Sequence, residues 1–132
     1  MSELAENVRA YLDEVRLAVF GTTNADGTPH LTGLWYELRG DTLVFSTVAK
    51  SRKVRNLRRD PRVAVTISDP AHPGGFYQVR GRAISITEEG GPEHIEMMAQ
   101  KYTGGSYPWY GGRDQVRVVI TIEAEKVSST GR

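Results

Sequence analysis

Apolar residues recur at helical spacing in three segments of the chain. The first segment steps by four and three residues, which predicts an amphipathic helix of about three turns. Its inward-facing residues should be Leu4, Val8, Leu12 and Val15. A short second helix should begin at Ser51, a residue type that caps helices, and end before Pro61. A third helix is predicted at residues 91–102, where an inward face is formed by Ile95, Met98, Ala99 and Tyr102.

Six further runs have the composition and alternation of β-strands. They lie at residues 16–23, 30–40, 41–48, 62–68, 76–86 and 116–127. Two pairs, Asp26-Gly27 and Gly40-Asp41, predict tight turns that join the first three runs as hairpins. Loops rich in Gly and Pro are expected at residues 69–75 and 103–114.

Strands linked by hairpins pair antiparallel, so these runs predict one antiparallel sheet. A six-stranded sheet with short helices at its ends favours closure into a small barrel. The predicted fold is therefore mainly β, with flanking α-helices. A length of 132 residues suits one domain, residues 1–132, and no linker, repeat or low-complexity tract divides the chain.

Composition restricts the setting of the protein. Hydrophobic residues at 39% and charged residues at 25% are ordinary for a globular domain. No apolar run approaches the ~18 residues of a membrane span, and the N-terminal segment is too acidic for a secretory signal. The chain contains no cysteine, which excludes disulfides, thiol nucleophiles and Cys-ligated metals. We therefore expect a cytoplasmic protein with no membrane contact.

Familiar catalytic motifs are absent from the sequence. It contains no G-x-G-x-x-G after a strand, no Walker phosphate loop, no H-E-x-x-H and no G-x-S-x-G. The three histidines, His30, His72 and His94, are far apart, so no metal site is expected. No catalytic residue is assigned, and an enzymatic activity would depend on a bound cofactor.

Positive charge is concentrated in one short segment. Residues 50–62 carry seven Lys and Arg and one Asp, although the formal net charge of the whole chain is only +1. Elsewhere ten Lys and Arg stand against fifteen Asp and Glu, a net charge of −5. The strand at 41–48 presents Ser46-Thr47 just before this segment. Hydroxyls, cations and a helix N-terminus thus converge on one place, as they do in phosphate-binding sites.

Three interpretations of the cationic segment compete. It could be a solvated helix face, a groove for nucleic acid, which small barrels also bind, or the site of a phosphate-bearing cofactor. The acidic remainder of the chain gives a weak long-range field, and no aromatic platform is interleaved with the charges. Both observations disfavour nucleic acid as the partner.

The segment LVFSTVAKSRKVRNLRRDPRVAVTI resembles the flavin-phosphate segment of the pyridoxamine 5′-phosphate oxidase-like superfamily. The stretches GTTNADGTPH and QVRGRA agree with the same superfamily, and the resemblance extends over residues 14–127. It implies an FMN-binding type of split β-barrel that forms a homodimer, with the cofactor between two barrels. The chain ends before the C-terminal substrate segment of the true oxidases. It is similar instead to the short branch of F420-dependent oxidoreductases.

That branch implies an activity. Reduced coenzyme F420, a deazaflavin with a phospholactyl and polyglutamate tail, would deliver a hydride to a planar, unsaturated organic acceptor. An FMN-dependent oxidase or reductase of the same fold is an alternative, and so is a non-catalytic protein that binds a flavin, haem or tetrapyrrole. Water and Arg117 are the candidates to supply the accompanying proton.

The resemblance also implies which residues hold the cofactor. The phosphate should be bound by Ser46, Thr47, Ser51, Arg52 and Lys53, with Lys50 and Asn56 close by. The strand from Thr32 to Tyr36 should lie beside the cofactor ring, where Trp35 or Tyr36 would stack. A strand position at Tyr77 touches the cofactor in the flavin branch. In the aromatic loop, Trp109 and Tyr110 would wall the pocket.

Overall fold

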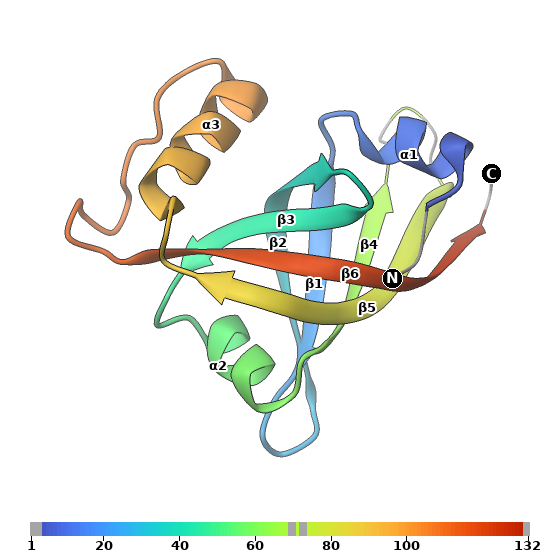
Figure 1. Cartoon of the computed structure of the whole chain (residues 1–132), viewed down its shortest axis with the longest axis horizontal. Helices are drawn as coiled ribbons and strands as arrows, with labels where there is room; N and C mark the ends of the chain where they lie inside the picture. Colours follow the sequence, from blue (N-terminus) through green and yellow to red (C-terminus); the bar gives the residue numbers. More distant parts are fainter. Residues whose placement is uncertain (1–3, 69–70, 72–73, 131–132) are drawn as a thin grey trace.

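Six antiparallel strands form a closed barrel in the computed structural model, which describes residues 4–68, 71 and 74–130 (Figure 1). The strands are β1 (Leu17–Thr23), β2 (Pro29–Arg39), β3 (Thr42–Val48), β4 (Arg62–Ser68), β5 (Phe76–Thr87) and β6 (Arg117–Thr130). Their order around the barrel is β1-β2-β3-β6-β5-β4, and each neighbouring pair is antiparallel. The prediction of a mainly β, six-stranded antiparallel barrel is confirmed.

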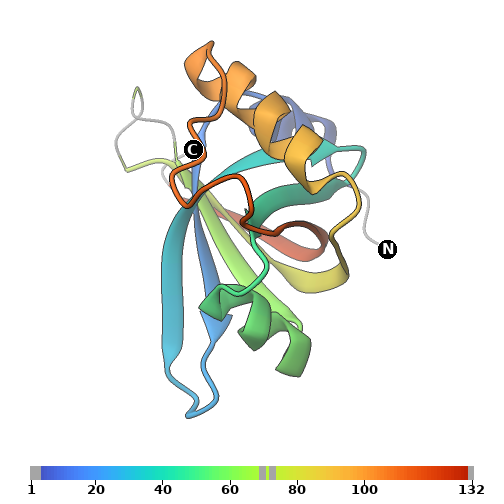
Figure 2. The same ribbon diagram turned by 90° about the vertical axis from the view of Figure 1, so that its left-hand side faces the viewer.

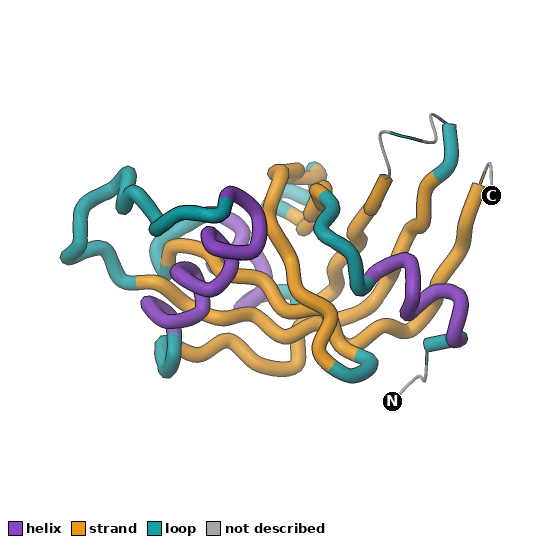
Figure 3. The backbone as a smooth tube through the Cα atoms, turned by 90° about the horizontal axis from the view of Figure 1, so that it is seen from above, coloured by secondary structure: helices purple, strands orange, loops and turns teal. Residues whose placement is uncertain are grey.

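Three short helices lie outside the barrel. They are α1 (Glu6–Leu12), α2 (Arg52–Arg59) and α3 (Gly91–Thr103). Seen from above, α1 and α3 lie toward opposite ends of the molecule (Figure 3). Helix α2 lies beside the β1–β2 hairpin (Figure 2). Among the described residues, no helix is long and apolar enough to cross a membrane.

Alternate residues of the strands fill the barrel. Phe20 and Phe45 meet edge to face with ring centroids 4.7 Å apart, and the ring of Tyr36 lies 6.3 Å from that of Phe45. All three side chains are buried, as are Val65 and Ile67 of β4. Burial of one such side chain contributes about 1.5–3 kcal/mol relative to its exposure. The strand alternation seen in the sequence therefore corresponds to the inside and outside of the barrel.

The first predicted helix is shorter than expected. Leu4, Val8 and Leu12 are buried against the barrel as predicted, but α1 ends at Leu12 and Val15 is exposed. The backbone N–H of Asp13 donates to the carbonyl of Arg9, and the chain then turns into β1. Val15 therefore lies in the connection rather than on the helical face. The predicted loop at 69–75 falls largely outside the described residues.

A close backbone contact between β5 and β6 depends on Gly81. The ladder between these strands shifts register after Arg80, and a Cβ atom added to Gly81 would lie 2.0 Å from the carbonyl oxygen of Glu123. That distance is far shorter than any ordinary contact, and the obstructing atom belongs to the backbone. Only glycine therefore fits this irregularity of the ladder.

We predict that Gly81→Ala lowers the free energy of unfolding by about 2 kcal/mol or more, because the added methyl forces two strands apart. Urea denaturation followed by circular dichroism measures the change. Gly105→Ala is the matched control, since the nearest atom to its added Cβ is 3.8 Å away. Equal stability of the two variants would contradict the close contact.

Candidate functional site

The end of β3, the first turn of α2 and the start of β6 meet at one corner of the barrel. Val48 is paired with Arg117 in the β3–β6 ladder, and the N–H of Ala49 donates to the carbonyl of Val116 at 2.9 Å. The N–H of Ser51 donates to the carbonyl of Val48 at 3.0 Å. The cationic segment therefore begins directly beside Arg117, which is 64 positions further along the chain than Lys53.

Lys53 is the buried cation of this corner. The residue is only 9% exposed, and its side chain makes no hydrogen bond or ion pair within the described residues. Burial lowers the pKa of Lys53, and the positive charge of Arg117 lowers it further. Removing part of the water around an ammonium group without supplying a partner is unfavourable, because the lost hydration is not replaced. This position therefore favours an anionic ligand.

Ser51 occupies the N-cap position of α2 but does not cap it. Its side chain makes no hydrogen bond to the helix, and its Oγ is buried without a partner among the described residues. The prediction of a capping side chain is therefore wrong, although the helix begins where expected. The first-turn N–H groups of α2 have no carbonyl partners within the helix. A hydroxyl and free N–H groups are thus available beside Lys53.

Arg117 is a second buried cation, only 7% exposed. Its Nε and Nη2 donate to Ser46 Oγ at 3.4 and 3.3 Å, and its Nη1 donates to the hydroxyl of Tyr107 at 3.1 Å. Its guanidinium carbon also lies 5.1 Å from the centroid of the Tyr107 ring. Burial lowers the pKa of Arg117. In the described part of the chain no carboxylate forms an ion pair with it.

Ser46 and Thr47 are both buried but face opposite sides of β3. Thr47 is paired with Val118, a core residue, and so points into the barrel. Ser46 points outward and accepts the hydrogen bonds of Arg117. Strand alternation separates the two hydroxyls, so they cannot both reach one phosphate from the same face.

Asn56 holds α2 against the barrel. Its Nδ2 donates to Thr22 Oγ1 and to Asn24 Oδ1, both at 3.0 Å, and its Oδ1 accepts a hydrogen bond from Arg59 at 3.4 Å. The amide hydrogens are thus used within the protein. The expectation that Asn56 binds the phosphate is replaced by a structural role. Lys50 and Arg52 are exposed on the outer side of the same corner.

A pocket of about 290 Å³ lies next to this corner, beneath α3. It is lined by Leu17, Gly33, Leu34, Trp35, Ser46, Ile95, Met98, Tyr107, Tyr110 and Arg117. The ring of Trp35 is half-buried and stacks on Tyr102, with centroids 5.1 Å apart and an interplanar angle of 16°. The described residues of the pocket therefore combine aromatic and aliphatic walls with a single charged group, Arg117.

Two strand residues expected at the cofactor ring are turned inward. The ring of Tyr36 lies in the barrel core, 1% exposed, and its hydroxyl donates to the carbonyl of Glu14. Tyr36 therefore cannot stack on a ligand outside the barrel. The prediction that Tyr36 stacks on the cofactor ring is wrong for this reason. Thr32 is paired with the core residue Phe20, and its Oγ1 has no partner among the described residues. Of this strand segment, the pocket includes Gly33, Leu34 and Trp35.

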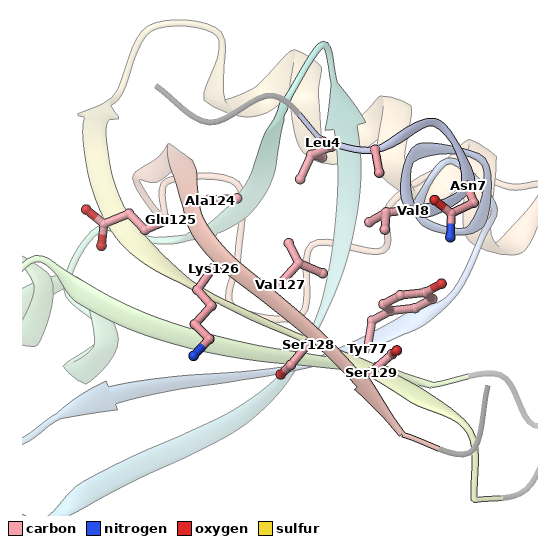
Figure 4. A pocket seen from close by; sticks show the side chains of 11 residues that line it. Leu4, Asn7, Val8, Tyr77, Ala124, Glu125, Lys126, Val127, Ser128 and Ser129 are labelled. Carbon is pink, nitrogen blue, oxygen red and sulfur yellow. The ribbon is translucent and has the colours of Figure 1, made fainter.

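Tyr77 lies at another site altogether. Its ring is 4.6 Å from that of Tyr11, and it lines a pocket of about 410 Å³ with Leu4 and Val8 of the α1 region (Figure 4). The phosphate corner lies where β3 meets α2, and none of its residues lines this pocket. Tyr77 is therefore not brought to the phosphate corner within one chain.

Helix α3 and the aromatic loop after it form the roof of the pocket. His94 Nε2 lies 3.2 Å from Glu37 Oε1, which anchors α3 on β2. The N–H of Tyr107 donates to Glu96 Oε1 at 3.1 Å, which fixes the loop to the helix. Of the two predicted pocket walls, Tyr110 lines the pocket, whereas Trp109 packs on Tyr107 behind it.

Sequence reasoning missed most of the pocket. Ile95 and Met98 were expected only on the inward face of a helix, and no role was predicted for Tyr107. Arg117 was named only as a possible proton source, although it is the charged group of the pocket. The available signal was its place among apolar residues at the start of a strand, between Val116 and the run Val118-Val119-Ile120. Within the described ranges, no three His, Asp or Glu residues are placed to hold a metal ion.

Comparison with known proteins identifies the family of the chain. A family model described as pyridoxamine 5′-phosphate oxidase matches residues 4–131. The structure of an F420 reductase superposes with a TM-score of 0.84 at 25% identity, covering 95% of this chain and 98% of that one. A conserved hypothetical protein from Mycobacterium tuberculosis gives a TM-score of 0.74 at 27% identity, covering 100% of this chain and 91% of the other.

Two further results complete the comparison. General Stress Protein 26 from Bacillus anthracis shares the fold, with a TM-score of 0.72 at 19% identity over 95% of this chain and 92% of that one. No curated protein matches the chain. The family match spans nearly the whole sequence, and the barrel and the strand order are those described above. The chain belongs to the pyridoxamine 5′-phosphate oxidase family, whose members share this split barrel.

Proposed function

We propose that the protein is an oxidoreductase that binds coenzyme F420 and reduces a planar organic acceptor. The observation that carries the proposal is the pair of buried cations, Lys53 and Arg117, with no carboxylate partner among the described residues. The unpartnered Ser51 hydroxyl lies at the same corner. A phosphate group would accept hydrogen bonds from that hydroxyl and from the first-turn N–H groups of α2, and would neutralise Lys53.

The choice of a deazaflavin over FMN has two supports. One is the likeness to an F420 reductase over nearly the full length of both chains. The other is charge, since Arg52, Arg55 and Arg58 are exposed around α2. A polyglutamate tail carries several carboxylates that such arginines would attract, whereas FMN has only its phosphate.

Different residues of this chain would bind the cofactor and the acceptor. Reduced F420 would supply a hydride, and the acceptor would take up that hydride together with a proton, so that the cofactor is oxidised as the acceptor is reduced. The corner at Ser51 and Lys53 would fix the cofactor by its phosphate. The pocket beneath α3 would hold the flat acceptor against its aromatic walls and exclude water from it. Arg117 lines that pocket, and the Nη hydrogens that it does not donate to Ser46 and Tyr107 would polarise the acceptor.

Homodimerisation is part of the proposal. Leu17, Val19 and Leu31 expose apolar side chains on the outer face of β1 and β2, and Leu31 is 66% exposed. The residues opposite Val19 and Leu31 in the ladder are Gly33 and Gly21, which leave this face flat. Leu17 also lines the pocket beneath α3. A second copy packed on this face would therefore close the open side of the pocket.

The direct test of the cofactor is a pair of titrations at physiological salt, followed by the fluorescence of Trp35 and Trp109. We expect saturable binding of F420 with a Kd in the micromolar range and little response to FMN. Tight binding of FMN with no response to F420 would assign the protein to FMN chemistry instead. Binding of neither would overturn the proposed function.

Reversing the charge of Lys53 tests the phosphate site. Lys53→Glu should weaken F420 binding by about 2 kcal/mol or more, roughly thirtyfold in Kd, because a buried carboxylate would repel the phosphate. Lys101→Glu is the matched control, since it makes the same charge change at an exposed position of α3. Similar affinities of the two variants would rule out Lys53 as a phosphate ligand.

The dimer is tested by Leu31→Glu. Symmetry would bury two unpaired carboxylates at the interface, which should raise the dimer dissociation constant on the order of thirtyfold or more. Sedimentation equilibrium measures the shift toward monomer. Ile84→Glu introduces the same charge at an exposed apolar residue of β5 and should leave the dimer intact. Dissociation of the dimer by Ile84→Glu but not by Leu31→Glu would place the interface on the β5 face that carries Ile84.

A further inference from the structure

The surroundings of Arg117 are unusual for a buried arginine. Its three hydrogen bonds all go to neutral hydroxyl oxygens, two to Ser46 Oγ and one to Tyr107. A guanidinium has five N–H groups, so one hydrogen on each Nη atom is left without a protein acceptor among the described residues. Buried charges are ordinarily paired, because burial otherwise removes hydration without compensation. The two free hydrogens are therefore available to an acceptor other than the described residues.

The hydroxyl groups fix the direction of the guanidinium. Ser46 holds it from one edge and the Tyr107 hydroxyl from another, and Glu96 in turn fixes the backbone of Tyr107. Gly91 lets α3 approach this point, since a Cβ there would lie 2.4 Å from the carbonyl oxygen of Arg117. Arg117 is thus held in place before any ligand arrives. A preorganised guanidinium fork matches the two oxygens of a carboxylate.

The pocket in front of Arg117 suits a flat, largely apolar molecule. Its walls are the Trp35 ring, the aliphatic side chains of Leu34, Ile95 and Met98, and the rings of Tyr107 and Tyr110. Among the described residues that line it there is no acidic side chain, and Arg117 is the only charged one. A volume of about 290 Å³ is close to the lower end of the range for small-molecule sites. Lys53 does not line this pocket, so the phosphate corner and the pocket are neighbouring but separate.

We infer that the pocket beneath α3 binds a planar, conjugated carboxylate through Arg117, with its ring against Trp35 and Tyr110. The assignment of this class of molecule as the hydride acceptor rests on the proposed function. The carboxylate would accept the two free Nη hydrogens, which satisfies the buried charge. The conjugated ring would fill the apolar part of the pocket. Arg117 would then determine specificity for an anion over a neutral molecule of the same shape.

The test compares 2-naphthoate with 2-naphthamide, which share a ring system and nearly the same shape but differ in charge. Isothermal titration calorimetry on the full chain should give a Kd for the carboxylate at least tenfold lower than for the amide. In Arg117→Gln the preference should fall below twofold, while the affinity for the amide stays near that of the wild type. Retained amide binding shows in the same experiment that the variant pocket is folded.

Two further variants sharpen the comparison. Arg117→Lys keeps the positive charge and should retain a preference for the carboxylate. This variant keeps the inference testable if Arg117→Gln does not fold. Arg113→Gln removes an exposed arginine from the same loop and should leave the tenfold preference unchanged. Equal affinities of the wild-type protein for the two probes would overturn the inference. So would a preference that survives Arg117→Gln, or one that is lost in Lys53→Gln instead.

The outcome is distinguishable from failure of the proposed function. F420 binding is measured separately and depends on the phosphate corner. A carboxylate preference that depends on Arg117 in a protein that binds no F420 would support the anion pocket and reject the proposed reaction. F420 binding without any carboxylate preference would reject the anion pocket alone.

Discussion

Burial of positive charge at one corner of the barrel is the constraint on which the functional features of the structure depend. Lys53 and Arg117 come from distant parts of the chain, and pairing of β3 with β6 brings them together. Burial lowers the pKa of both groups, and the positive charge of Arg117 lowers the pKa of Lys53 further. A fold that needed only stability would place an apolar or acidic residue here. Anionic ligands would resolve the conflict, with a phosphate at Lys53 and a carboxylate at Arg117 as proposed above.

The neighbouring helices are held in place by contacts that do not pair with either cation of this corner. Asn56 ties α2 to the end of β1, and the Tyr102 hydroxyl contacts the backbone of Arg16 and of Tyr36 and so holds α3 to the barrel. These contacts use neutral groups, so the helices are fixed while the two cations keep their hydrogen-bonding capacity. The result is a rigid frame around one polar corner and one apolar pocket, the arrangement expected of a preorganised binding site.

Most of the fold could be predicted from sequence because it follows from local patterns. Strand alternation and the turn at Asp26-Gly27 identify hairpins wherever they occur. The site was harder to predict, because its details depend on which face a residue takes and on distant partners. Trp35 and Tyr36 are adjacent, yet one lines the pocket and the other lies in the core. The local sequence at Ser51 predicts that its side chain caps α2. The structure shows instead that the hydroxyl makes no hydrogen bond to the helix or to any other described residue. Arg117 meets Ser46 across 71 positions, which no local motif reveals.

The most direct test of the central claim is a crystal structure of the protein with F420 bound. The account predicts that the cofactor phosphate lies within hydrogen-bonding distance of Ser51 Oγ and Lys53 Nζ, with the deazaflavin ring directed toward the pocket beneath α3. A phosphate bound only by the exposed arginines of α2, with Lys53 still unpaired, would contradict it.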